Sequence, residues 1–353
     1  MILVINPGSS SLKIKIFDNN FNVVKSIDFD YLTEYGRKRE SAAGEIVREV
    51  AEEQKKIEKI GYRVVHGGDE AEEIMPITLP VMNIIKKFSP LAPFHNPEVE
   101  KIIRVLIEKI PFAQHFAVFD TAFFRNLPNV SKIYPLNQQI ADELGIKRYG
   151  FHGISHQWTV NQVDSDHSKK MITIHLGAGS SLAAINRGKP IDTSMGFTPV
   201  GGVAMQNRSG DLDPEIIFAL INHLGQKKAK EMIEFHSGMA GMTNSSGNML
   251  TLLAVAGEKV EDKEYHLGMD KMAKNFTKEE AALAIELFCY RVKKCLGAYI
   301  AVLGGVDIVA FSGEIGFGSS VIRNKILSGL KFLNFQVEVV KPDEELAIAK
   351  KLK

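Results

Sequence analysis

Two turns rich in glycine and serine could bind a phosphate group. One is Gly177-Ala178-Gly179-Ser180-Ser181, which lies between two apolar runs that we expect to be strands. Small residues in such a turn let backbone N–H groups approach an anion closely. A tight β-hairpin without a ligand has the same composition, so a single turn of this kind leaves both readings open. The chain, however, opens with a similar turn, Pro7-Gly8-Ser9-Ser10-Ser11.

The two turns belong to a longer repeat. With an offset of 170 positions, Met1 aligns with Met171, and Ser10 and Leu12 align with Ser180 and Leu182. An echo at this distance predicts two similar domains, each with a phosphate-binding hairpin, that face each other across a nucleotide-sized cleft.

Charged side chains lie near the ends of other predicted strands. Arg63 precedes the end of a strand over 57–66 and is either a charge on the strand face or a clamp for an anionic ligand. Asp120 follows a buried strand over 116–119 and is either a ligand-binding residue or the N-cap of the next turn. Arg208 lies in the run 207–214, which we interpret as a functional loop, although a capped helix start needs some of the same residues.

One histidine pair has the spacing of a metal site. His152 and His156 are separated by four positions, but the glutamate of an HExxH motif is missing. Gly150 and Gly153 favour a loop around His152. We therefore do not expect zinc here.

The composition is that of an ordinary globular protein. The chain has 353 residues, of which 45% are hydrophobic and 24% charged, and this length favours two domains. A formal charge of +1 gives no general attraction to nucleic acid or to an anionic membrane, so we expect neither as a partner. The two cysteines, Cys289 and Cys295, point in different directions on one predicted helix, and no signal segment or long apolar run is evident. We expect a cytoplasmic protein.

Strands and helices alternate along the chain in the manner of an α/β protein. After the two opening strands we expect a third strand over 22–32 and a helix over 38–56. Further helices are expected over 80–87, 97–110, up to 163, over 214–224 and over 278–303. Further strands are expected over 171–175, 306–311 and 332–340, with a glycine-rich turn at 312–318 and a closing helix after Pro342.

Seven runs of the sequence resemble the signature motifs of the acetate kinases. They are NPGSSSLK, RVVHGG, PFHNP, VFDTAF, RYGFHGISH, the run from HLGAGSS to DTSMGFTP, and RSGDLDP. Together they cover nearly the whole chain. The resemblance extends to the larger group of acetate and sugar kinases, actin and heat-shock chaperones.

The resemblance implies a fold and a division of the chain. The fold is α/β, with two duplicated actin-like (ribonuclease H-like) domains, each a mixed five-stranded sheet flanked by helices, and a cleft between them. Residues 1–146, joined by the C-terminal helix 344–353, would form the acetate domain. Residues 147–343 would bind the nucleotide and form a homodimer contact.

The reaction implied by the resemblance is reversible phosphoryl transfer between ATP and acetate. A carboxylate that attacks a terminal phosphoryl group needs positioning and cancellation of charge, with no covalent help from the protein. Arginine suits both tasks because its guanidinium group matches carboxylate and phosphate geometry. By resemblance the catalytic residues are Asp120, His152 and Arg208, with Asp120 orienting the reactants.

The ligand-binding residues follow from the same resemblance. Arg63 would hold the acetate carboxylate in a pocket suited to a methyl group and lined by Val65, Phe94, His95, Phe151 and Pro199. The phosphates and nucleotide would face Ser9, Ser11, Lys13, His175, Leu176, Gly177, Ala178, Gly179, Gly313, Glu314, Ile315, Gly316 and Phe317. Mg²⁺, for which Mn²⁺ can substitute, would be bound by Asn6 and Glu344 directly or through water.

The sequence departs from the family pattern at four places. Ala178 replaces a phosphate-binding asparagine, Asn248-Met249-Leu250 replaces a D-x-R nucleoside contact, Glu314 replaces a glycine under the adenosine, and Phe94 replaces a pocket leucine. Three of the four concern the nucleoside side. A relative that uses pyrophosphate has a bulky residue at the same glycine, so a pyrophosphate-dependent enzyme is an alternative. A propionate kinase and a non-catalytic actin-like module are further alternatives.

Overall fold

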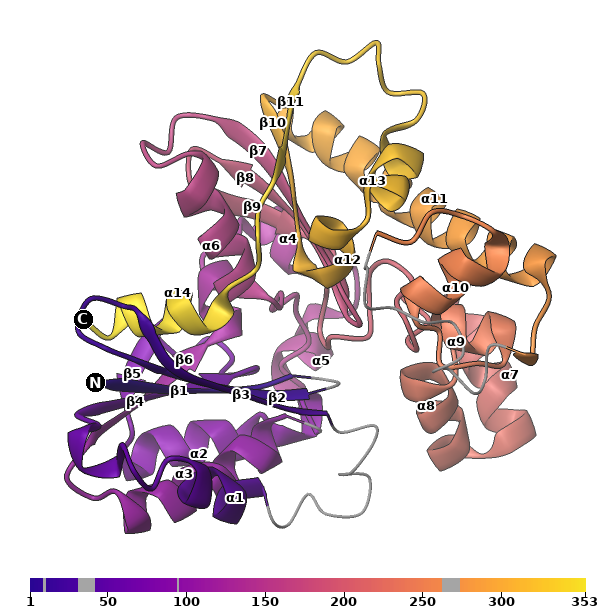
Figure 1. Ribbon diagram of the computed structural model, residues 1–353. Helices are drawn as coiled ribbons and strands as arrows, with labels where there is room; N and C mark the ends of the chain where they lie inside the picture. Colours follow the sequence, from indigo (N-terminus) through magenta and orange to yellow (C-terminus); the bar gives the residue numbers. More distant parts are fainter. Residues whose placement is uncertain (9–10, 31–41, 94, 262–273) are drawn as a thin grey trace. The chain divides into compact units, whose positions relative to one another are not determined.

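The computed structural model describes residues 1–8, 11–30, 42–93, 95–261 and 274–353. The chain forms two compact units (Figure 1). The first unit contains Met1–Asn126, Phe151–Trp158 and Asp343–Lys353, and the second contains Leu127–Gly150 and Thr159–Pro342. Each unit is built on one mixed sheet flanked by helices, as the predicted α/β class requires.

The sheet of the first unit has six strands in the order β3-β2-β1-β4-β6-β5. β1, β2 and β3 are antiparallel neighbours, whereas β4 runs parallel to β1 and to β6. The strands are β1 (Ile2–Pro7), β2 (Ser11–Phe17), β3 (Val23–Asp30), β4 (Lys59–Val64), β5 (Ile74–Pro76) and β6 (Gln114–Phe119). The expected five strands are present, and the short edge strand β5 is an addition, because three residues are too few to show an alternating pattern.

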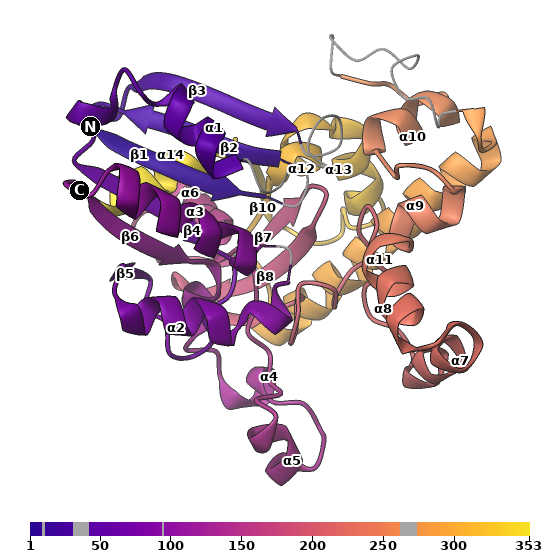
Figure 2. The ribbon, with the colours of Figure 1, turned by 90° about the horizontal axis from the view of Figure 1, so that it is seen from below.

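The alternation of β1 divides its side chains between two cores. Leu3 and Ile5 pack in the cluster that includes side chains of α1 (Ala42–Glu49), α2 (Leu79–Lys87) and α3 (Asn96–Lys109). Ile2 and Val4 pack in a second cluster with α14 (Glu344–Lys351). Figure 2 views the molecule from the side of α1, α2 and α3, which lie in front of this sheet. The last helix thus covers the opposite face of the first sheet.

The helix expected over 38–56 is too long at its C-terminal end. α1 ends at Glu49, and only a short 3-10 helix, η2 (Gln54–Lys56), follows. The run from Glu52 to Lys56 contains no apolar residue that a longer helix could bury. Positions 38–41 lie outside the described residues. Two further 3-10 helices, η3 (Ser89–Leu91) and η4 (Asp120–Phe124), complete the first unit.

The sheet of the second unit has the order β11-β10-β7-β8-β9. Its strands are β7 (Lys170–Leu176), β8 (Ser180–Asn186), β9 (Lys189–Thr193), β10 (Ile308–Ser312) and β11 (Gln336–Val339). β7, β8 and β9 form the antiparallel part, and β10 runs parallel to both β7 and β11. The antiparallel hairpin beside a parallel strand repeats the arrangement of β1, β2 and β4, as the 170-residue repeat predicts.

Helices of the second unit pack on this sheet and extend beyond it. α10, α11 and α13 share one buried cluster with β7, β8 and β10. A capping box between Thr277 and Glu280 begins the long helix α11, and Gly304 in the left-handed conformation ends it. The helices are α4 (Asn129–Lys132), α5 (Gln138–Glu143), α7 (Pro214–Leu224), α8 (Gln226–Phe235), α9 (Gly238–Thr243), α10 (Met249–Ala256), α11 (Lys278–Leu303), α12 (Gly313–Gly318) and α13 (Ser320–Leu327). Helix α6 (Gly153–Val163) begins in the first unit, and its residues from Thr159 on belong to the second.

Two expectations for this unit need correction. The glycine-rich turn expected at 312–318 is the short helix α12, which begins at Gly313 in a positive-φ conformation. The last strand begins at Gln336 rather than 332. The apolar side chain of Phe332 suggested a strand, but it is 80% exposed. Among the described residues, no helix combines the length and apolar character needed to cross a membrane.

The turn after β4 is fixed by side chains from three elements. The Asn96 amide accepts a hydrogen bond from the His66 N–H at 3.2 Å and donates one to the His66 carbonyl at 2.8 Å. Thr121 Oγ1 accepts from the Gly67 N–H at 3.2 Å. Gly68 has φ +61°, and a Cβ there would lie 2.0 Å from Phe88 Cζ, so only glycine fits. These contacts set the end of the strand that carries Arg63.

His66 is the buried centre of this turn. Its ring stacks on Phe88, with centroids 4.8 Å apart and planes 12° from parallel. Its Nδ1 accepts a hydrogen bond from the Gly68 N–H at 3.1 Å. Burial lowers the pKa of His66 to about 3, against a smaller opposing effect of Asp69. The imidazole is therefore neutral in the folded protein over the whole neutral pH range.

We expect the free energy of unfolding to fall as the pH is lowered from about 6.5 towards 3, by up to about 1.4 kcal/mol per pH unit from His66. The reason is that the unfolded chain binds a proton in this range and folded His66 does not. His66→Asn keeps an acceptor near the Nδ1 position but cannot titrate, so it should flatten this part of the profile. Chemical denaturation over a pH series measures the slope.

The matched control is His223→Asn in α7, where the histidine is exposed. The control should retain the wild-type slope. If His66→Asn loses stability towards acid as steeply as the wild-type chain does, the buried neutral state of His66 is wrong, whatever the variant's stability at pH 7.

Candidate active site

In the first unit, Arg63 and Asp120 form a buried ion pair. Arg63 Nε and Nη2 donate to Asp120 Oδ2 at 2.9 and 2.6 Å. Arg63 Nη1 donates to Asn6 Oδ1 at 3.0 Å. The side chains of Arg63 and Asp120 are only 13% and 1% exposed. Arg63 is therefore not a charge on an exposed strand face.

Asp120 also ties the end of β6 to the start of α6. Its Oδ1 accepts a hydrogen bond from the Ile154 N–H at 3.2 Å, in the first turn of that helix. Asp120 is not the N-cap of its own turn, because Phe119 occupies that position of η4. A Cβ on Gly153 would lie 1.9 Å from the Asp120 carbonyl oxygen. The glycine is what allows α6 to approach this closely.

An excess of carboxylates surrounds Arg63. Burial alone would lower the pKa of Arg63, but Asp120 and then Glu344 and Glu345 outweigh it, so that its pKa is raised. Glu345 is 3% exposed and accepts a hydrogen bond from the Asn6 side-chain amide. It also forms an ion pair with Lys15, whose Nζ lies 3.0 Å from Glu345 Oε2.

Lys15 adds one more acidic partner to this group. Its Nζ contacts Asp343 Oδ1 at 2.8 Å, and Asp343 also caps α14. Four carboxylates, those of Asp120, Asp343, Glu344 and Glu345, thus gather with two cationic side chains. Asn6 and Glu344 offer the oxygen donors that Mg²⁺ prefers, but no three acidic side chains of the described ranges are grouped to hold a metal ion, so Mg²⁺ at this pair would take its remaining ligands from water and phosphate.

The predicted acyl-pocket residues of the first unit lie around the turn after β4. Val65 is buried in the turn, and His95 is the buried N-cap residue of α3. Phe151 meets the His66 ring edge-on, with centroids 5.3 Å apart. Phe94 lies outside the described residues, and Pro199 belongs to the second unit.

His152 directly precedes α6 and has φ +57°. A left-handed backbone is uncommon for residues other than glycine and occurs often at functional sites. Its carbonyl accepts from the His156 N–H at 2.9 Å, and the buried His156 ring packs edge-on against Phe124. No group of three His, Cys, Asp or Glu residues in the described ranges could hold a metal ion. His156 is accounted for by packing.

The predicted phosphate residues of the opening hairpin lie at one end of β1 and β2. Lys13 is the cross-strand partner of Asn6, and the Gly8 N–H donates to the Ser11 carbonyl at 2.8 Å. Ser9 lies outside the described residues.

In the second unit the structure brings three predicted segments together. The Gly177 N–H donates to the Gly179 carbonyl at 3.0 Å, and a Cβ on Gly313 would lie 2.4 Å from the Leu176 carbonyl. The loop at 199–208 is the third segment, and it contacts the glycine turn through the Gln206 N–H, which donates to the Ala178 carbonyl at 3.3 Å. Residues 175–179, 313–317 and 199–208 therefore form one cluster at the ends of β7 and β10. Its contacts are mostly between backbone groups.

Arg208 is the buried cation of this cluster. Its Nη1 donates to the Pro199 carbonyl at 3.2 Å. Burial lowers the pKa of Arg208 to about 10, with Glu234 acting in the opposite direction. The guanidinium group remains protonated at neutral pH, so it places a buried positive charge in this cluster. A site of this kind favours the arrival of negative charge.

The departures on the nucleoside side have definite places in the structure. Asn248 caps α10, with its Oδ1 accepting from the Leu250 and Thr251 N–H groups at 2.9 and 3.2 Å. Glu314 is exposed in the first turn of α12. Asn248 therefore serves the helix itself, whereas the Glu314 carboxylate is open to solvent in the cluster described above.

Sequence reasoning did not single out several residues that hold these side chains. Glu345 orients the Asn6 amide, and Asn96 and Thr121 hold the turn after β4. In the second unit, Arg148 holds the end of β9 by donating to the Thr193 carbonyl. Three of them lie inside quoted motifs, PFHNP, VFDTAF and RYGFHGISH, which was the available signal.

Comparison with known proteins agrees with these features. The sequence model described as the acetokinase family matches residues 37–350. The acetate kinase of Clostridium kluyveri is 34% identical over 370 residues, covering 96% of this chain and 87% of that protein. The crystal structure of acetate kinase from Entamoeba histolytica has a TM-score of 0.84 at 27% identity, covering 100% of this chain and 98% of the other. A propionate kinase from Francisella tularensis has a TM-score of 0.83 at 28% identity, covering 99% and 98%.

These matches confirm the predicted actin-like α/β fold and the resemblance stated from the motifs. The family model spans most of the chain, and the relatives match at more than 30% identity over nearly its whole length. The chain belongs to the acetokinase family.

Proposed function

We propose that this chain is an acetate kinase that transfers a phosphoryl group between ATP and acetate. An acetate oxygen forms the new bond to the γ-phosphorus, the bond from that phosphorus to the ADP oxygen breaks, and acetyl phosphate and ADP leave. The observation that carries the proposal is the presence of one largely buried arginine in each unit, Arg63 and Arg208. Arg63 is matched by carboxylates, and Arg208, whose pKa is lowered, lies in the loop bonded to the glycine turn at 177–179.

Arg63 is suited to orient the acceptor carboxylate. An arginine has five N–H groups, and the contacts to Asp120 and Asn6 use one on each of its three nitrogens. Nη1 and Nη2 each keep a second N–H group that can donate to a bound carboxylate. Asp120 holds the guanidinium plane while the substrate binds. Arg208 and His152 then stabilise the charge that develops on the transferred phosphoryl group.

Mg²⁺ would be held through Asn6 and Glu344, with Mn²⁺ as a substitute. When bound, the cation neutralises phosphate charge during the transfer. Glu345 is engaged with Asn6 and Lys15 and therefore serves to orient the Asn6 amide. We assign the acetate side to residues 1–146 with 344–353, and the nucleotide side to residues 147–343.

We propose a homodimer on the basis of exposed apolar side chains in the second unit. Five large apolar side chains between positions 130 and 144 are each more than half exposed: Val130, Ile133, Leu136, Ile140 and Leu144. We take this concentration of exposed apolar side chains in one segment as the basis of an interaction surface. Sedimentation at micromolar concentration tests this, and a mass of 39.1 kDa would contradict it. A cytoplasmic location is proposed from the free thiols of Cys289 and Cys295, and cell fractionation tests it.

Arg208→Ala should lower kcat for acetyl phosphate formation by about 10³-fold or more, by analogy with arginine fingers. Its charge acts on the transition state, so KM for acetate should change much less. Trapping acetyl phosphate as the hydroxamate measures the rate. Arg187→Ala, in the exposed hairpin between β8 and β9, is the control and should behave as wild type.

A wild-type chain that transfers no phosphoryl group to acetate or propionate from any donor would favour the non-catalytic alternative. Arg208→Ala with kcat within a few-fold of wild type would refute the role of Arg208 alone. We expect acetate to be preferred to propionate, because the pocket suits a methyl group. The preference should be limited, since one added methylene is worth only about 1–3 kcal/mol of discrimination.

A substitution of Glu314 tests which compound is the phosphoryl donor. If ATP is the donor, as we propose, Glu314→Gly should alter KM for ATP modestly and leave KM for acetate unchanged, because backbone groups of 177–179 and 313–316 form the phosphate site. If the carboxylate blocks the adenosine, the same substitution should create or greatly raise activity with ATP. Rates with ATP, GTP and pyrophosphate should be measured side by side for both chains. Strong wild-type activity with pyrophosphate and none with ATP would overturn the proposal.

A further inference from the structure

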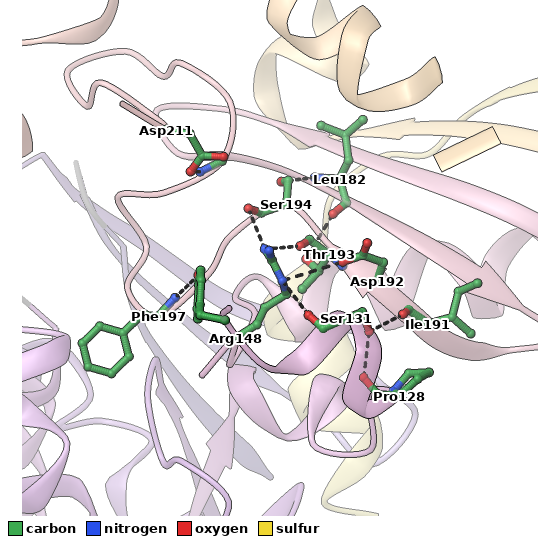
Figure 3. A network of polar contacts seen from close by, with 12 residues as sticks. Pro128, Ser131, Arg148, Leu182, Ile191, Asp192, Thr193, Ser194, Phe197 and Asp211 are labelled. Carbon is green, nitrogen blue, oxygen red and sulfur yellow. Dashed lines mark hydrogen bonds and ion pairs between the residues drawn. The ribbon is translucent and has the colours of Figure 1, made fainter. Parts of the chain in front are cut away.

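Arg148 connects two segments of the second unit that are far apart in sequence (Figure 3). It follows α5 and directly precedes the Tyr149-Gly150 part of its motif. Its Nη1 donates to the Thr193 and Ser194 carbonyls at 2.8 and 3.3 Å, where β9 ends. Its Nε donates to the Ser131 carbonyl at 3.0 Å, and Asp192 lies 3.7 Å away. A single guanidinium group therefore holds three carbonyl oxygens from two segments.

Tyr134 reinforces the same connection. The Arg148 guanidinium lies over the Tyr134 ring, 5.6 Å from its centroid. The Tyr134 hydroxyl accepts a hydrogen bond from the Phe197 N–H at 3.1 Å, and a Cβ on Gly196 would lie 1.9 Å from that hydroxyl. The Tyr149 N–H donates to the Gly196 carbonyl at 3.0 Å. Residues 194–197 are thus fixed from both sides.

The segment held in this way is the base of the loop that carries Arg208. A Cβ on Gly202 would lie 2.6 Å from the Ser194 carbonyl, so the loop packs back on its own base. Asp211 Oδ1 accepts from the Gly202 N–H at 2.7 Å, and the Asp211 N–H donates to the Gly202 carbonyl at 2.8 Å. Within the closed loop, the Pro199 carbonyl accepts from Arg208. Hydrogen bonds and close backbone contacts thus lead from Arg148 through the base of the loop to Arg208.

We infer that Arg148 is a positioning residue for the phosphoryl-transfer reaction, acting through the 194–211 loop on the guanidinium of Arg208. This inference rests on the proposed function for the role of Arg208. Arginine is required because a planar group with several donors is needed to reach Ser131, Thr193 and Ser194 at once while lying flat on Tyr134. Lysine would keep the charge but could not replace this geometry.

Kinetics of single and double variants test the inference. Arg148→Lys and Tyr134→Phe should lower kcat by about 10- to 100-fold, since small displacements of a catalytic group far from the mutation can have effects of this size. KM for ATP should change little. When Arg208 is already alanine, adding Arg148→Lys should lower kcat by less than about 3-fold, because residues that act as a unit are not additive. Arg187→Ala, exposed in the same unit, is the control.

Hydrogen exchange provides a readout that does not depend on activity. In Arg148→Lys, amides of the 194–211 loop, including those of Phe197 and Gly202, should exchange faster, while those of β7 and β10 remain protected. Equal losses of kcat from Arg148→Lys in the wild-type and Arg208→Ala backgrounds would overturn the inference, as would unchanged loop exchange. Inactivity of the wild-type chain with every donor would refute the proposed function instead, and the exchange result would still decide whether Arg148 holds the loop.

Discussion

The buried contact between Arg63 and Asp120 is the constraint on which the first unit depends. Asp120 uses one carboxylate oxygen for Arg63 on β4 and the other for the first turn of α6, and its own position ends β6. Two strands and a helix are thus tied to one side chain that is 1% exposed. Truncating either partner of such a pair removes the closest counter-charge of a buried group, which is destabilising. The architecture around the site follows from avoiding that situation.

The second unit uses a different principle. Its predicted phosphate segments are connected through backbone N–H and carbonyl groups, and side chains such as Arg148 act at the periphery to hold those backbones. The Ala178 carbonyl, for example, accepts a hydrogen bond from the Gln206 N–H.

Much of this organisation could be predicted from the sequence. Short apolar runs on either side of small-residue turns predicted β1, β2 and β7, and the similarity of the two turns at an offset of 170 positions predicted two similar domains. The predicted end of α1 was wrong. The charged run after the helix is compatible with a helix but has no apolar side chain to bury, so the helix stops at Glu49. β5 was not predicted, because a run of three residues is too short to show a strand pattern. It is a strand because it pairs with β6.

The candidate site was predictable in its residue types and less so in its connections. Arg63 and Asp120 were singled out separately, each with a structural alternative, because nothing in the sequence shows that they touch. Glu344 and Glu345 are neighbours with the same chemistry, and only burial and the contacts to Asn6 and Lys15 distinguish their roles. Arg148 and Tyr134 lie fourteen residues apart and act on backbone carbonyl and amide groups, which carry no signal of their identity in the sequence.

The central claim is that Asp120 holds the Arg63 guanidinium so that its remaining N–H groups receive the acceptor carboxylate. A crystal structure of the chain with acetate bound tests this most directly. The account predicts both acetate oxygens on Nη1 and Nη2 of Arg63, with Nε still donating to Asp120. Acetate bound away from Arg63, or an Arg63 side chain that has left Asp120 to reach it, would contradict the account.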